Sequence, residues 1–179
     1  MNLLLSVFTV VVVVASAGVV PHGDLPMQNP DLFEGDILGI KNAEERNAIV
    51  NRNQLWPGGV VPYVIDYSLS IQRGKIIAAM NQYHARTCIK FKERTTETNY
   101  VRMFEGQGCY SYVGNIFRGG QDLSLGNGCI YPGTIVHELG HAIGFFHEQN
   151  RSDRDDYLII YWDNIQRGML LFYSNYILE

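Results

Sequence analysis

Apolar and polar residues follow two different periods along this chain, and the periods predict where its helices and strands lie. Apolar residues recur at helical spacing across residues 70–86, at Ile71, Ile76, Ile77, Met80 and Tyr83. A second helix is predicted over residues 133–146, where the apolar positions again share one face. Short alternating or continuous apolar segments predict five strands: residues 60–66, 88–92, 100–104, 109–113 and 121–125.

These elements predict an α+β domain. We expect a twisted, mostly antiparallel sheet of five strands, one long helix over residues 70–86 and the second helix beneath the sheet. Pro62 lies inside the first predicted strand and has no backbone N–H to donate. That strand is therefore expected at or near an edge of the sheet.

The first 46 residues predict a processed leader. Residues 1–17 are an apolar run ending in Ala15, Ser16 and Ala17, which is typical of a secretory signal peptide and its cleavage site. Residues 18–46 are rich in proline and glycine and contain few apolar runs, so we interpret them as a propeptide. Residues 47–179 then form the folded domain. An anchored form that retains residues 1–17 is the alternative, although a membrane span needs roughly 20 residues.

The composition of the chain limits the classes of molecule that we expect it to bind. The 179 residues are 46% hydrophobic and 18% charged, and the net charge is −4. This composition predicts a globular domain, and the absence of a basic run argues against a nucleic-acid partner. Together with the signal peptide, it predicts a protein that is secreted to the extracellular space and needs no membrane partner.

The second helix carries the candidate chemistry. His137 and His141 are four residues apart and therefore share one helix face, from which two imidazoles can reach one point. Gly144 permits a left-handed exit from the helix, which can return His147 to the same point. Three imidazoles leave one position of a tetrahedral zinc ion open for water, and Glu138 is placed to accept that water's proton.

The same segment could instead be an ordinary core helix with incidental polar residues. Ile135, Leu139 and Ile143 do supply an apolar face. That interpretation does not explain why three of the five histidines of the chain fall within eleven residues at the spacing HExxHxxGxxH. The extended spacing is specific to the metzincin class of zinc peptidases, so we expect one catalytic Zn²⁺ ion.

Three cysteines, Cys88, Cys109 and Cys129, cannot all pair within the chain. A secreted protein favours disulfides. A bridge between Cys109 and Cys129 would close a glycine-containing loop and contribute about 3 kcal/mol in the chain-entropy model. Cys88 would then remain unpaired in this chain.

Four separate motifs resemble the astacins, a family of secreted zinc endopeptidases within the metzincins. They are LWPGGVVPY at residues 55–63, TCI at 87–89, GCYSYVG at 108–114, and residues 137–155 with their HEQ and RSDRD segments. The resemblance implies a metzincin catalytic domain with His137, His141 and His147 as zinc ligands and Glu138 as general base. It also implies a Cys109–Cys129 disulfide and, for Cys88, a partner near the end of the family's domain.

The resemblance further implies a zymogen. The sequence FEGD at residues 33–36 resembles the FxGD motif of astacin propeptides, whose Asp, here Asp36, occupies the open zinc position. Cleavage between Arg46 and Asn47 by a trypsin-like protease would release the mature chain. The new ammonium of Asn47 would then reach Glu148, which we expect to be a buried carboxylate in need of a cation.

The chain ends at Glu179 without the Met-turn that the family places beneath its zinc. We therefore expect a catalytic domain that lacks most of its C-terminal subdomain. The first functional hypothesis is a secreted, latent zinc endopeptidase that acts on proteins or peptides. The alternative is a truncated zinc-binding fragment without catalytic activity.

Overall fold

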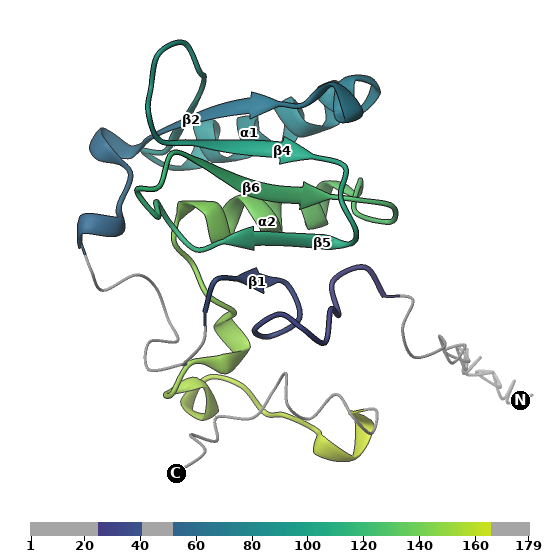
Figure 1. The fold of residues 1–179 in the computed structure, drawn as a ribbon. Coiled ribbons are helices and arrows are strands. Elements are labelled where there is room, and N and C mark those ends of the chain that lie inside the picture. Colours follow the sequence, from purple (N-terminus) through teal and green to yellow (C-terminus); the bar gives the residue numbers. More distant parts are fainter. Residues whose placement is uncertain (1–24, 41–51, 166–179) are drawn as a thin grey trace, which may run out of the picture.

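The computed structural model describes residues 25–40 and 52–165. One sheet contains six strands in the order β1-β5-β6-β4-β2-β3. The strands are β1 (Ile37–Leu38), β2 (Val60–Ile65), β3 (Lys90–Glu93), β4 (Tyr100–Phe104), β5 (Cys109–Tyr112) and β6 (Gly120–Leu125). The helices α1 (Arg73–Arg86) and α2 (Pro132–Ile143) lie on the same face of this sheet (Figure 1).

Short 3-10 turns connect these elements. They span Arg52–Gln54, Pro57–Gly59, Tyr67–Gln72, Glu148–Asn150, Arg154–Asp156 and Trp162–Asn164. The turn before α1 starts at Asp66, whose carboxylate accepts a hydrogen bond from the Ser68 N–H at 3.1 Å. Residues 70–72 of the predicted helix belong to this 3-10 turn, so the α-helix itself begins at Arg73.

The expectation of a mostly antiparallel sheet is wrong. Four of the five strand pairs are parallel, and only β5 and β6 are antiparallel. Consecutive strands are not always neighbours in space, since β3 and β4 flank β2 on opposite sides and β6 separates β4 from β5. The five expected strands are present, and the sixth, β1, comes from the expected propeptide.

Strand β2 lies second from the sheet edge, in agreement with the position expected from Pro62. The register shows why the missing N–H is tolerated. Pro62 is paired with Lys92 of β3, whereas pairing with β4 begins one residue later, at Tyr63 and Val101. At Pro62 the strand therefore has a paired neighbour on one side only.

The hydrophobic core fills the space between the sheet and the two helices. It includes fully buried side chains from β2, β4, β6, α1 and α2, such as Val61, Met103, Leu123, Ile76 and Leu139. A disulfide joins Cys109 of β5 to Cys129 just before α2, while Cys88 is free and exposed. Among the described residues, no helix is both long and apolar enough to cross a bilayer.

Two hydrogen bonds fix α2 against the rest of the core. The Tyr83 hydroxyl of α1 donates to the Val136 carbonyl at 2.7 Å, and the Trp56 indole donates to the Ala142 carbonyl at 2.7 Å. The helices approach closely at Gly140, where an added Cβ would lie 3.2 Å from the Tyr83 hydroxyl. The helix that carries the candidate ligands is thus held by its neighbours at both its middle and its end.

Candidate metal centre

Helix α2 brings the first two histidines together. Pro132 occupies its first turn, where the missing N–H has no helical partner to lose. His137 and His141 project from successive turns, and their Nε2 atoms are 3.0 Å apart. The apolar face of the helix is buried in the core, which fixes the direction in which the two imidazoles point.

The third histidine returns to the same point after a glycine turn. The helix ends at Ile143, and Gly144 has a φ of 134°, a conformation that residues with a side chain rarely adopt. His147 Nε2 consequently lies 3.1 Å from His137 Nε2. Three nitrogens bound at about 2.1 Å to one tetrahedral ion would be roughly 3.4 Å apart, so the histidines fit a zinc ion with a small expansion.

Hydrogen bonds at the far side of two rings orient them. His141 Nδ1 is 2.7 Å from the Phe145 carbonyl, and His147 Nδ1 is 2.7 Å from the Glu34 carboxylate. A carbonyl and a carboxylate only accept, so each Nδ1 carries a proton, and Nε2 is the nitrogen of each ring that faces the centre. This is the arrangement of metal-binding histidines with their outer-sphere partners.

Asp36 supplies a fourth donor. Its Oδ2 lies 3.0 Å from His137 Nε2 and 3.3 Å from His147 Nε2, and its side chain is almost fully buried. Burial alone would raise the pKa of Asp36, but hydrogen bonds with His137, His141 and His147 outweigh it and hold the pKa far below its usual range. Asp36 and the three histidines offer ligand atoms within 4.8 Å of one another and could bind one zinc ion.

The centre favours positive charge. Burial lowers the pKa of His147, yet the hydrogen bonds and charges of Asp36 and Glu34 raise it to about 9. Carboxylates that stabilise an added proton at this point also stabilise a cation there, because the same electrostatic attraction applies to both. A divalent ion bound to the three nitrogens would supply this positive charge.

Glu138 is fully buried next to the first histidine, and neither of its carboxylate oxygens has a hydrogen-bond partner among the described residues. Burial, and then the negative charge of Asp36, raises the pKa of Glu138 well above its ordinary value. A buried carboxyl group with a raised pKa and free oxygens is suited to accept and return a proton. The role of general base expected for Glu138 stays a prediction.

Glu148 is exposed in this chain, which retains its leader, so the expected pairing of a buried Glu148 with the Asn47 ammonium of the mature chain stays a prediction. The Glu148 side chain is 68% exposed, and it forms an ion pair with Arg151. His147 begins a short turn that directs Glu148 outward while the ring turns inward, so the two adjacent residues face opposite environments. Arg46 and Asn47, the expected cleavage site and mature terminus, lie outside the described residues, as do residues 1–17.

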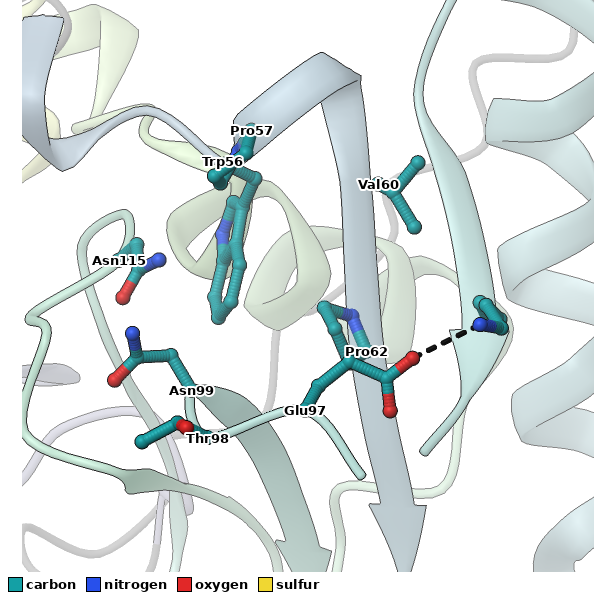
Figure 2. Close-up of a pocket in the computed structure, with 9 residues that line it drawn as sticks. Trp56, Pro57, Val60, Pro62, Glu97, Thr98, Asn99 and Asn115 are labelled. Atoms are coloured by element: carbon teal, nitrogen blue, oxygen red, sulfur yellow. Dashed lines mark hydrogen bonds and ion pairs between the residues drawn. The ribbon is translucent and has the colours of Figure 1, made fainter. Parts of the chain in front are cut away.

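A second hollow lies at the start of β2 and has different chemistry. It encloses about 280 Å³ between Trp56, Pro62, Asn99 and Asn115, and Figure 2 shows the Trp56 ring facing both amides. Its one carboxylate, Glu97, is bound to Lys92 at 2.9 Å. The hydrogen bonds from Lys92 and Thr95 lower the pKa of Glu97 to about 2. Among the described residues that line this hollow, there is no histidine or cysteine.

The sequence pattern identified the three histidines, Glu138 and Asp36, but it missed Glu34. Glu34 stands at the variable position of the FxGD motif, so the motif gave no reason to select it. An acidic residue two positions before Asp36 was the available signal. The Phe145 carbonyl was also missed, because a backbone acceptor leaves no trace in the sequence.

Comparisons with known proteins point to one family of peptidases. Residues 48–176 match the family model for Astacin, which is described as a peptidase family. Blastula protease 10 of Paracentrotus lividus is 42% identical over 86% of this chain, and Meprin A subunit beta of Mus musculus is 48% identical over 77%. This chain spans only 26% and 19% of those two relatives.

A solved structure has the same fold. It is High choriolytic enzyme 1, described as a hatching enzyme zinc-protease from Oryzias latipes, with a TM-score of 0.57 and 41% sequence identity. The likeness covers 69% of this chain and 60% of that chain. The α+β catalytic-domain fold expected from the sequence is thereby confirmed.

Proposed function

This chain belongs to the astacin family of metallopeptidases, and from this premise we propose that it acts as a secreted zinc endopeptidase that is synthesised as a latent zymogen. The observation that carries the proposal is the convergence of three imidazole Nε2 atoms on the carboxylate of Asp36. Its substrates would be proteins or peptides.

The proposed roles follow from the geometry. His137, His141 and His147 would hold the ion through Nε2. When bound, zinc supplies Lewis-acid polarisation of a carbonyl and lowers the pKa of a water molecule. Glu138 would take a proton from that water and return it to the leaving amine, as its burial and raised pKa favour. Asp36 occupies the position that water or substrate needs, so the leader must depart before hydrolysis.

Substitution of Glu138 tests the proposal. Glu138→Gln retains the shape of the side chain but cannot accept a proton, so the zinc content should be unchanged and peptide hydrolysis should fall about 10²–10⁴-fold. Glu105→Gln, at an exposed position, is the control and should retain full activity. Normal turnover by Glu138→Gln would refute the assignment. Stoichiometric zinc without hydrolysis in the activated wild type would instead favour the inactive zinc-binding fragment.

Activation is proposed to separate residues 18–46 from the domain that begins at Asn47. Arg46→Ala should leave the chain uncut by trypsin at this bond, whereas the matched control Arg52→Ala should be cut normally. N-terminal sequencing of the product is the measurement. A new terminus at Asn47 in the Arg46→Ala variant would contradict the site. The same sequencing of secreted material tests whether residues 1–17 are removed as a signal peptide.

A further inference from the structure

The leader segment is anchored to β5, and its strand β1 forms the edge of the sheet beside it. The Cys109 N–H donates to the Pro26 carbonyl at 2.7 Å, and the Ser111 N–H donates to the Asp36 carbonyl at 3.0 Å. Ile37 of β1 is fully buried, so the segment is held by both backbone and side-chain contacts. Figure 1 shows β1 beside β5, at the end of the sheet nearest the segment that follows α2.

The loop before β1 has an unusual backbone. Glu34 has a φ of 52° and Gly35 a φ of 94°, and the loop is closed by hydrogen bonds between Phe33 and Ile37 at 3.0 and 3.2 Å. A positive φ is uncommon at a residue with a side chain. In this conformation the carboxylates of Glu34 and Asp36, two residues apart, both reach the histidines.

The two carboxylates contact opposite sides of one ring. Glu34 Oε2 lies 2.7 Å from His147 Nδ1, whereas Asp36 Oδ2 lies 3.3 Å from His147 Nε2. The Glu34 side chain is only 7% exposed, so the contact is shielded from water. The equivalent partner of His141 is the Phe145 carbonyl, which belongs to the same polypeptide segment as the histidines. Of these two rings, only His147 takes its described Nδ1 partner from the leader.

We propose that Glu34 is a positioning residue for His147, through which the leader strengthens zinc binding in the precursor while Asp36 closes the site. The inference rests on the proposed zinc centre and adds a second task to the leader. A carboxylate that accepts the Nδ1 proton fixes the ring and increases the basicity of Nε2, so zinc is held more tightly. Departure of the leader would remove this partner along with the blocking ligand.

The test measures zinc release from the full chain to a chromophoric chelator. Loss of an outer-sphere partner costs about 10–100-fold in metal affinity, so Glu34→Ala should release zinc at least about tenfold more readily. Glu34→Gln retains a neutral acceptor and should fall between Glu34→Ala and the wild type. Asp31→Asn is the matched control, because Asp31 is an exposed acid of the same leader and its side chain has no described contact with the histidines. It should match the wild type.

A spectroscopic measurement separates positioning from general support of the fold. In the zinc-loaded chain with ¹⁵N-labelled histidine, the Nδ1–H resonance of His147 should shift strongly in Glu34→Gln, while that of His141 should stay in place. Wild-type zinc release by both Glu34 variants, with an unshifted His147 resonance, would overturn the inference and leave Glu34 as a docking contact only. Failure of the wild-type chain to bind zinc at all would refute the proposed function instead.

Discussion

The two halves of the candidate metal site are attached to the protein by different means. The histidine half lies on α2 and the turn that follows it, and this helix packs into the core through fully buried residues such as Ile135 and Leu139. The carboxylate half, Glu34 and Asp36, lies on a tight loop and a strand of two residues at the sheet edge. The histidine half is therefore part of the core, whereas the carboxylate half lies at the edge of the sheet.

This difference matters for the proposed zymogen, in which the histidines would stay in place and the carboxylates would be removed. His137 and His141 lie on a helix that Tyr83 and Trp56 hold in place, so the backbone that carries these two ligands is fixed by contacts outside the leader. The carboxylates depend on a short edge strand, which can leave without unfolding the sheet, because β5 keeps its pairing with β6. A latent enzyme requires this division, since activation must remove the block and leave the ligands in place.

The largest effect is expected from breaking the histidine half. His141→Ala removes one of three nitrogen donors and should abolish stoichiometric zinc binding, a greater loss than the roughly 10–100-fold that an outer-sphere change costs. Zinc content after gel filtration is the measurement. His84→Ala is the control, because His84 lies on α1 and its Nε2 accepts a hydrogen bond from the Phe91 N–H instead of facing the centre. Full zinc occupancy in His141→Ala would show that the centre lies elsewhere.

A smaller effect is expected from breaking the carboxylate half. Asp36→Asn replaces a charged donor with a neutral amide, so an external zinc ligand should enter the site more easily. We expect acetohydroxamate to bind the zinc-loaded precursor roughly tenfold more tightly in this variant. The side chain at position 36 competes for the same zinc position from within the chain, and Asn competes less strongly than Asp. Titration calorimetry measures the affinity, with Asp31→Asn as control. Equal affinities in wild type and Asp36→Asn would mean that Asp36 does not occupy the open position.

The two halves were not equally predictable from the sequence. The histidine spacing is local, so helical geometry alone places His137 and His141 together, and one glycine accounts for His147. The contact between Asp36 and these histidines joins residues about a hundred positions apart, and only the family resemblance indicated it. Glu34 is also distant from the histidines in the sequence, and it was missed because it stands at the variable position of the FxGD motif.

The strands of the sheet were predicted but their pairing was not, because local periodicity does not reveal that β3 and β4 flank β2. The pairing of Glu148 with Asn47 stays a prediction, because it belongs to the mature chain and Asn47 lies outside the described residues.

The smallest effect concerns the contact that holds the histidine half against α1. The Tyr83 hydroxyl donates to the Val136 carbonyl, one residue before His137. Tyr83→Phe removes this hydrogen bond and should lower the free energy of unfolding by about 1 kcal/mol, while zinc content stays at the wild-type level. Chemical denaturation measures the difference. Tyr67→Phe, at a residue that is 89% exposed, is the control and should change stability little.

The difference in the free energy of unfolding between the wild type and Tyr83→Phe should also depend on pH. Burial raises the pKa of Tyr83 to about 12, whereas an unfolded tyrosine ionises near a pKa of about 10. The unfolded chain therefore loses this proton first, so the stability contributed by neutral Tyr83 is complete below about pH 10 and is lost as the pH rises toward 12. The wild type should approach the stability of Tyr83→Phe across this window. A constant difference from pH 9 to 12 would show that α2 does not depend on the Tyr83 proton, and that packing around Gly140 alone holds the histidine half in place.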